Sequence, residues 1–268
     1  MALTVGLVSY LNTAPLTFAL GELAREDWRF VEAQPTELNQ ALAQGKLDLG
    51  LISSYEYARG DYLLLPDVSI SATGRVGSVL LFSRLPLDRL SGEEVVLTKA
   101  SATSVALLKL LLEDFCGLKP HYRVGTAREL EGAAAYLAIG DEALRLRHRP
   151  PFPEAHDLAA LWMEHTRLPF VFAVFAVRKE AWEEKAKAIR DFALALYLSR
   201  AKGLSALTGL ASQCVRLSGL SAGECLLYLK GIEYDLSGLK QEALSVFFQH
   251  LFRRGEIPRV PSLKFIDL

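Results

Sequence analysis

Apolar runs and helical patterns alternate along the first two thirds of the chain. The runs that predict strands cover residues 4–8, 29–32, 48–52, 68–72, 77–82, 95–98, 121–124, 135–139 and 170–177. Apolar residues at helical spacing between them predict helices near residues 14–22, 36–44, 53–59 and 102–115, and from residue 141 onward. This alternation predicts an α/β fold with a mainly parallel sheet that carries helices on both faces.

The pattern changes after residue 178. From Trp182 to Leu196, apolar residues recur at spacings of four and three, which predicts one face of an amphipathic helix. Further helices are predicted near residues 206–217, 222–230 and 240–254. The sheet-forming part of the chain is therefore followed by a helical part, and composition alone sets no boundary between the two.

The composition is that of a well-packed globular protein, with 268 residues of which 51% are hydrophobic and 23% are charged. A net charge of -1 gives no basis for binding nucleic acid, and no polybasic run favours an anionic membrane surface. Residues 168–177 form the longest uncharged apolar stretch, which is too short to cross a membrane.

The N-terminal residues and the cysteines bear on the compartment in which the protein works. The N-terminal residues lack the basic segment and the cleavage site of a secretory signal. Cys116, Cys214 and Cys225 form no CxxC pattern, which favours reduced thiols over a disulfide framework. Together these features predict a cytoplasmic protein that has neither nucleic acid nor a membrane as a partner.

Small hydroxyl and amide residues follow several of the predicted strands, at the points where helices begin. The candidate ligand-binding residues are Tyr10 and Asn12, Ser53 and Ser54, Ser101, Thr103 and Ser104, and Asp141. In open α/β sheets, ligands bind at the carboxyl ends of the strands, and helix N-termini favour anions there. The pattern predicts a site for a small anion, although helix capping alone accounts for any one of these residues. For Asp141, which is also a candidate general base, a structural role at a helix start is the preferred interpretation.

The sequence carries none of the common catalytic or cofactor-binding motifs. Its five histidines form no HExxH pair, which argues against a zinc site. There is no GxSxG elbow, no phosphate-binding GxxxxGK[ST] loop and no GxGxxG turn after a strand. We therefore expect no metal site.

Seven segments, in order along the chain, resemble the chorismate dehydratases of the futalosine route to menaquinone. They are VGLVSYLNTAPL (5–16), DLGLISSYEY (48–57), GSVLLFSR (77–84), SATSVALL (101–108), IGDEAL (139–144), LPFVFAVFAV (168–177) and YLKGIEYDL (228–236). Each segment is a weak signal by itself, and together they form a fairly specific match that spans nearly the whole chain.

The resemblance implies a fold and a division of the chain. It implies a two-lobed α/β fold of the type 2 periplasmic-binding-protein kind, with a ligand cleft between the lobes. The chain would cross between the lobes near residues 83–84 and 177–178. Lobe 1 would then contain residues 1–83 and 178–268, and lobe 2 would contain residues 84–177.

The resemblance also implies a reaction, the conversion of chorismate into 3-[(1-carboxyvinyl)oxy]benzoate and water, with no metal or organic cofactor. It places Asn12 and Ser78 at the reacting centre. Asn12 would bond the leaving hydroxyl or the enolpyruvyl carboxylate, and Ser78 would orient the ring or relay a proton. The remaining candidates would bind the substrate, with Tyr10 against the ring and the hydroxyl residues Ser53, Ser54, Ser101, Thr103 and Ser104 at the carboxylates.

Three alternatives remain open on the sequence alone. A non-catalytic solute-binding protein of the same fold would be expected to carry an export signal or a lipobox cysteine. Another enzyme of the same pathway and fold, such as a naphthoate synthase, would be expected to carry a catalytic histidine in a cleft loop, and neither His121 nor His148 lies in such a segment. A ligand-sensing regulatory domain would be expected beside a DNA-binding extension.

Overall fold

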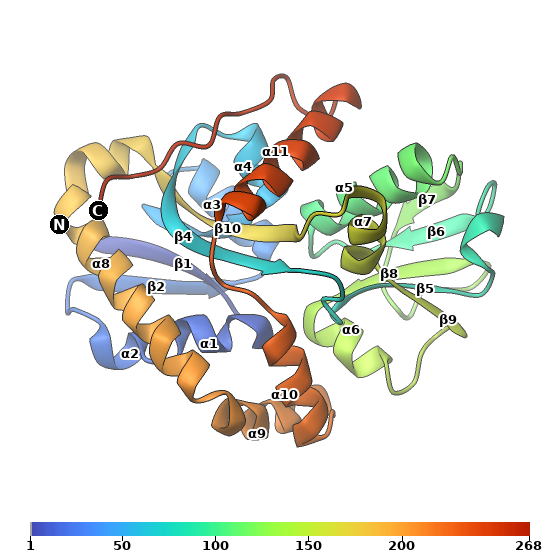
Figure 1. Ribbon diagram of the computed structural model, residues 1–268, viewed down its shortest axis with the longest axis horizontal. Helices are drawn as coiled ribbons and strands as arrows, with labels where there is room; N and C mark the ends of the chain where they lie inside the picture. The colour runs from blue at the N-terminus through green and yellow to red at the C-terminus, as the bar shows by residue number, and fades with distance from the viewer. Residues whose placement is uncertain (1) are drawn as a thin grey trace.

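Two five-stranded sheets, each at the centre of its own lobe, organise the computed structural model of the chain (Figure 1). The structure describes residues 2–268, so residue 1 of the predicted first lobe lies outside the described part. The first sheet contains, in spatial order, β2 (Trp28–Ala33), β1 (Leu3–Val8), β3 (Leu49–Ser53), β10 (Phe170–Arg178) and β4 (Tyr62–Ala72). The second sheet contains β7 (His121–Val124), β6 (Glu94–Leu97), β8 (Ala135–Ile139), β5 (Val79–Ser83) and β9 (Glu154–Asp157).

Helices pack on both sheets, and the helical C-terminal part belongs with the first one. The helices of the N-terminal part are η1 (Leu11–Thr13), α1 (Ala14–Thr17), α2 (Leu20–Leu23), α3 (Pro35–Ala43) and α4 (Ser54–Arg59). The second lobe carries α5 (Ala102–Lys109), the π-helical turn η3 (Leu110–Phe115), the short 3-10 turn η2 (Leu87–Arg89), α6 (Gly140–Leu146) and α7 (Leu158–Thr166). The C-terminal part forms α8 (Lys179–Ser205), α9 (Leu207–Ser218), α10 (Ala222–Gly231) and α11 (Gly238–Arg253). No helix within residues 2–268 combines the length and apolarity that a membrane crossing needs.

Both sheets are mixed: in each one, four of the five strands run in the same direction, in line with the predicted mainly parallel arrangement, and one strand is reversed. In the first sheet, β1 pairs in parallel with β2 and β3, whereas β10 is antiparallel to β3 and β4. In the second sheet, β6 pairs in parallel with β7 and β8, whereas β5 is antiparallel to β8 and β9. The reversed strands β5 and β10 are the ones that enter each sheet directly from the other lobe. The other strands of each sheet end at the side that faces the other lobe. A strand that comes directly from the other lobe begins at that side, so it runs in the opposite direction.

The chain crosses between the lobes one strand earlier than the resemblance suggested, at both crossings. β5 belongs to the second sheet, so the first crossing lies in residues 73–78 and not at 83–84. β10 belongs to the first sheet, so the second crossing lies in residues 167–169 and not at 177–178. The two crossings lie next to each other because the end of β4 pairs with the start of β10, with Ala72 opposite Phe170. The apolar runs that end near residues 83 and 177 are therefore the first strands after each crossing, and not the last strands before it.

An aromatic cluster next to the second crossing packs α7 of the second lobe against β10 and α11 of the first lobe. Trp162 of α7 is fully buried and meets the rings of Phe170 and Phe247 edge-on, at centroid distances of 5.3 and 6.2 Å. Its indole N–H donates to the carbonyl oxygen of Pro169 at 3.0 Å. Phe172 packs edge-on against Phe170, with the ring centroids 4.7 Å apart. This cluster fixes the start of β10, and through it the position of the Phe172 ring. Neither β9 nor α7 was predicted from the sequence.

Candidate functional site

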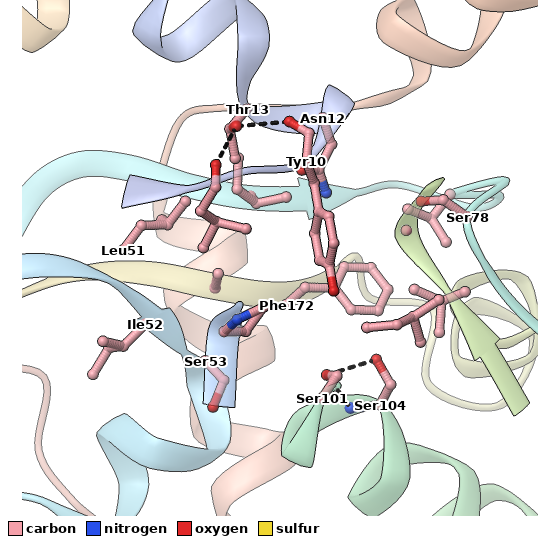
Figure 2. Close-up of a pocket in the computed structure, with 18 residues that line it drawn as sticks. Tyr10, Asn12, Thr13, Leu51, Ile52, Ser53, Ser78, Ser101, Ser104 and Phe172 are labelled. Carbon is pink, nitrogen blue, oxygen red and sulfur yellow. Dashed lines mark hydrogen bonds between the residues drawn. The ribbon is translucent and has the colours of Figure 1, made fainter. Parts of the chain in front are cut away.

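A cavity lies between the two lobes, at the ends of strands from both sheets (Figure 2). Its walls come from β1 and η1, the end of β3, the residues before β5, the start of α5, the end of β8 and the start of β10. None of the described residues that line it carries a charge. An anion in this cavity would therefore be held by neutral donors such as hydroxyls, amides and the N–H groups at helix starts.

The structure brings six of the nine candidate residues to the lining of this one cavity. They are Tyr10, Asn12, Ser53, Ser78, Ser101 and Ser104. Asn12 and Ser78 were predicted to meet at a reacting centre, and they come from different parts of the fold, η1 and the first crossing. Separate burial of these two side chains would have excluded a shared role, and the structure places both at the same cavity.

The Asn12 side chain offers an acceptor that the protein leaves free. Its Oδ1 atom is buried and has no hydrogen-bond partner among the described residues. An unpartnered buried acceptor costs about 1–3 kcal/mol, so such groups are rare in folded proteins. Because Asn12 lines the cavity, a ligand that donates a hydrogen bond to it would remove this cost.

Ser53 is held so that its hydroxyl hydrogen stays available. Ser53 caps the N-terminus of α4, with Oγ accepting from the Glu56 N–H at 3.1 Å. The Asn39 Nδ2 group donates to the same oxygen at 3.0 Å, and the Ser53 N–H donates to Asn39 Oδ1 at 3.1 Å. With its oxygen accepting twice, the hydroxyl can still donate to a ligand carboxylate. Sequence reasoning missed Asn39, although an asparagine between Leu38 and Leu42 on the buried face of α3 is a visible signal.

Ser101 and Ser104 form a coupled pair at the start of α5. Ser101 caps the helix by accepting from the Ser104 N–H at 3.1 Å, and its hydroxyl donates to Ser104 Oγ at 3.0 Å. The hydroxyl hydrogen of Ser104 is then left to point elsewhere, and both residues line the cavity. The free N–H groups of the first turn lie at the same wall, where the helix dipole favours negative charge.

Tyr10 extends from the segment that carries Asn12 toward Ser101 and Ser104 (Figure 2). Its ring rests against Gly140, where a Cβ atom would come within 3.3 Å of three ring carbons. Its hydroxyl donates to Gln34 Oε1 at 2.5 Å. Burial, followed by the carboxylates of Asp141 and Glu142, raises the pKa of Tyr10 to about 12. Tyr10 is therefore a neutral ring that closes one side of the cavity. Phe172, which sequence reasoning missed, contributes a second ring to the lining, from β10 of the same lobe.

Three candidates do not line the cavity, because each is committed to a partner within the protein. The Ser54 hydroxyl donates to the carbonyl oxygen of Val171 at 2.7 Å. Thr103 Oγ1 accepts from the Tyr55 N–H at 2.9 Å, and Asp141 Oδ1 accepts from the Leu11 N–H at 3.2 Å. The last two bonds run from the second lobe to the first, so Thr103 and Asp141 hold the lobes together over the cavity.

The bond from Leu11 to Asp141 leads to a prediction about pH. Burial raises the pKa of the Asp141 carboxyl, and the Leu11 N–H and the Arg145 guanidinium lower it only in part. A carboxyl whose pKa is raised by folding costs stability as the pH rises through that pKa. Asparagine keeps an oxygen for the Leu11 N–H and does not ionise. We therefore expect Asp141→Asn to unfold at a higher temperature than the wild type at about pH 7, and the two midpoints to converge near about pH 4.

Thermal unfolding at a series of pH values checks this expectation, with Asp88→Asn at an exposed position as the control. A difference between the Asn variant and the wild type that stays constant with pH would contradict it. So would a variant that is less stable than the wild type near neutral pH.

Comparison with known proteins identifies the family. Residues 3–253 match the family described as menaquinone biosynthesis. A chorismate dehydratase from Thermus thermophilus is 39% identical over 276 aligned positions, which cover 92% of this chain and 97% of that relative. The chain belongs to the chorismate dehydratase family. A second chorismate dehydratase, from Campylobacter jejuni, is 32% identical over 66% of this chain and 68% of its own length. The resemblance found in the sequence is thereby confirmed.

Solved structures confirm the fold predicted for the chorismate dehydratase family. A crystal structure from Archaeoglobus fulgidus has a TM-score of 0.78 at 17% identity and covers 96% of this chain and 98% of its own. The periplasmic aliphatic sulphonate binding protein SsuA from Escherichia coli has a TM-score of 0.69 at 15% identity, covering 100% and 94%. At such identities the likeness concerns the fold alone, which is the two-lobed periplasmic-binding-protein fold.

Proposed function

We propose that this protein is a chorismate dehydratase, a carbon–oxygen lyase that converts chorismate into 3-[(1-carboxyvinyl)oxy]benzoate and water in menaquinone biosynthesis. The observation that carries the proposal is the shared cavity. Asn12 and Ser78, together with capping serines from both lobes, line one cavity in a chain that is 39% identical to a chorismate dehydratase.

The chemistry of the reaction suits a cavity that has no charged lining. The bond between a ring carbon and its hydroxyl breaks, a neighbouring ring carbon loses a proton, and the two leave together as water. The ring gains its third double bond and becomes aromatic, so the driving force lies in the substrate. The protein then has to hold the ring in the eliminating geometry and stabilise the charge that develops, which needs no metal or organic cofactor.

The residues at the cavity divide this work. In the proposal, the Asn12 amide bonds the leaving hydroxyl or the enolpyruvyl carboxylate. Its unpartnered Oδ1 supports the first role, because it can accept from the hydroxyl, whereas a bond to the carboxylate would use the Nδ2 donor. Ser78 orients the ring or relays a proton. Ser53, Ser101 and Ser104 donate to the carboxylates, and the carboxylate of the substrate itself is one acceptor for the ring proton.

Two aromatic rings of the cavity lining complete this arrangement. Tyr10 and Phe172 both line the cavity, and in the proposal their rings pack against the ring of the substrate. Apolar contact of this kind excludes water and leaves the polar groups to set the orientation of the substrate.

We also propose that the reaction takes place in the cytoplasm. Cys116, Cys214 and Cys225 are all free thiols in the structure, and Cys214 and Cys225 are buried. Free cysteines are the usual state of a protein in a reducing compartment, which supports this location.

Incubating the purified protein with chorismate tests the proposed function. We expect chorismate to disappear with the appearance of an aromatic product whose mass equals that of chorismate less one water, with or without a metal chelator present. Heat-denatured protein provides the control. Chorismate that stays unchanged while calorimetry detects its binding would contradict catalysis and favour a non-catalytic binding protein of this fold.

A further inference from the structure

Two tyrosines from the C-terminal part of the chain donate hydrogen bonds to the two residues of the proposed reacting centre. The Tyr228 hydroxyl donates to Ser78 Oγ at 3.1 Å, and the Tyr234 hydroxyl donates to the backbone carbonyl oxygen of Asn12 at 2.8 Å. These bonds join positions 150 and 222 residues apart in the sequence. Tyr228 and Tyr234 are 5% and 3% exposed, so neither can exchange its partner for bulk water.

The local structure fixes both tyrosines. Tyr228 lies on α10, which begins with a capping box between Ser221 and Glu224. After α10 the chain pairs with β4, because the Glu233 and Ser71 backbones exchange N–H to carbonyl bonds at 2.9 and 3.0 Å. The Ser69 N–H donates to the Tyr234 carbonyl oxygen at 3.1 Å. The segment that carries Tyr234 therefore extends the edge of the first sheet.

The protonation of Tyr228 decides the direction of its hydrogen bond. Burial raises the pKa of the Tyr228 hydroxyl well above its ordinary value, and the Ser78 bond offsets this only in part. The phenol is therefore neutral at any pH at which the protein works, and it donates its hydrogen to Ser78 Oγ. A serine hydroxyl has one hydrogen of its own, and Ser78 Oγ has no second partner among residues 2–268. That hydrogen remains free at the wall of the cavity that Ser78 lines.

We propose that Tyr228 is a positioning residue for the reaction: it occupies one lone pair of Ser78 Oγ and thereby directs the Ser78 hydrogen toward the bound substrate. The inference rests on the proposed function, since it assigns a role within that reaction. Tyr228 does not line the cavity, so its hydroxyl acts through Ser78 and not on the substrate. Tyr234, on the next segment of the chain, donates to the backbone carbonyl oxygen of Asn12.

A double-mutant cycle separates positioning from a structural role. Tyr228→Phe keeps the ring and removes the hydroxyl, and Ser78→Ala removes the only group through which that hydroxyl is proposed to act. We expect Tyr228→Phe to lower kcat about tenfold with KM within about twofold of wild type, since one hydrogen bond between neutral groups contributes on this scale. In the Ser78→Ala background the same exchange should have no further effect on kcat. Single-turnover rates with enzyme in excess keep the slow variants measurable.

Tyr57→Phe is the matched control. Tyr57 is 2% exposed, and its hydroxyl donates to the Ser262 carbonyl oxygen at 3.2 Å, outside the cavity lining. We expect its loss to lower the unfolding temperature and to leave kcat unchanged. A second variant, with 3-fluorotyrosine at position 228, keeps both the ring and the hydroxyl, and should retain kcat within about twofold of the wild type.

The possible outcomes distinguish the inference from the proposed function. Equal losses from Tyr228→Phe in the wild-type and Ser78→Ala backgrounds would overturn the positioning role, and so would a fluorotyrosine variant as slow as the phenylalanine variant. Wild-type protein that leaves chorismate unchanged would overturn both the proposed function and the inference that rests on it.

Discussion

Replacing Asn12 by alanine will lower kcat by about a hundredfold, and will change KM less, if the amide contacts the group that leaves. Removing one oriented hydrogen-bonding group from a reacting centre has an effect of about this size. The Asn12 side-chain oxygen has no partner within the described part of the chain, so its removal breaks no bond on which the fold depends. We therefore expect the unfolding temperature of Asn12→Ala to equal or exceed that of the wild type.

Asn12→Asp provides the second arm of this experiment. Aspartate has the same shape as asparagine but adds a negative charge to a cavity whose described lining carries no charge. We expect KM for chorismate to rise at least about tenfold, because two like charges a few ångströms apart repel in a poorly hydrated site. Steady-state kinetics on both variants measure these effects. Asn12→Ala with wild-type kcat would remove Asn12 from the mechanism.

Gly140→Ala is the second substitution for which we expect a large effect. Gly140 begins α6 with a φ of +56°, and a Cβ atom there would come within 3.3 Å of the Tyr10 ring. Alanine would strain the backbone at this positive φ, and its methyl group would displace the Tyr10 ring, which lines the cavity. We expect kcat/KM to fall at least about tenfold and stability to fall by about 1–2 kcal/mol.

Gly92→Ala is the matched control for this experiment. Gly92 has a φ of +77° in the same lobe, and a Cβ atom there would meet nothing within 4 Å. We therefore expect Gly92→Ala to lower the free energy of unfolding by about 1–2 kcal/mol, as Gly140→Ala does, because both positions have a positive φ. The activity of Gly92→Ala should be unchanged. Kinetics combined with chemical denaturation of both variants separate the two effects. Equal activity of the two variants would contradict the view that Gly140 makes room for Tyr10.

The apolar pattern of the sequence predicts where strands and helices lie. It does not predict the direction in which a strand runs within its sheet. The run at residues 48–52 reads as a strand covered on both sides, and β3 is buried throughout. No pattern tells whether a strand runs with or against its neighbours, so the reversal of β5 and β10 stayed hidden. The crossings were misplaced for the same reason. A crossing is defined by which sheet a strand joins, and that depends on pairing between distant segments.

The candidate site shows a similar limit. Ser53 and Ser54 are adjacent and chemically alike, yet only Ser53 lines the cavity, while Ser54 bonds the Val171 carbonyl oxygen. Strand alternation and helix geometry decide which of two neighbours faces a ligand, and an error of one residue reverses the answer. Asn39 and Tyr228 were missed because they act through partners 14 and 150 residues away.

The uncharged lining of the cavity bears on how the product leaves. Under the proposed reaction both carboxylates survive, so the product carries the same two negative charges as chorismate. Arginine or lysine clamps would grip the two molecules about equally, which strengthens binding without speeding the chemical step. Hydroxyl and amide donors hold the carboxylates more weakly. We therefore expect the site to bind its substrate less tightly than a site with arginine or lysine clamps would. It should also bind the aromatic product less tightly, so that the product dissociates readily.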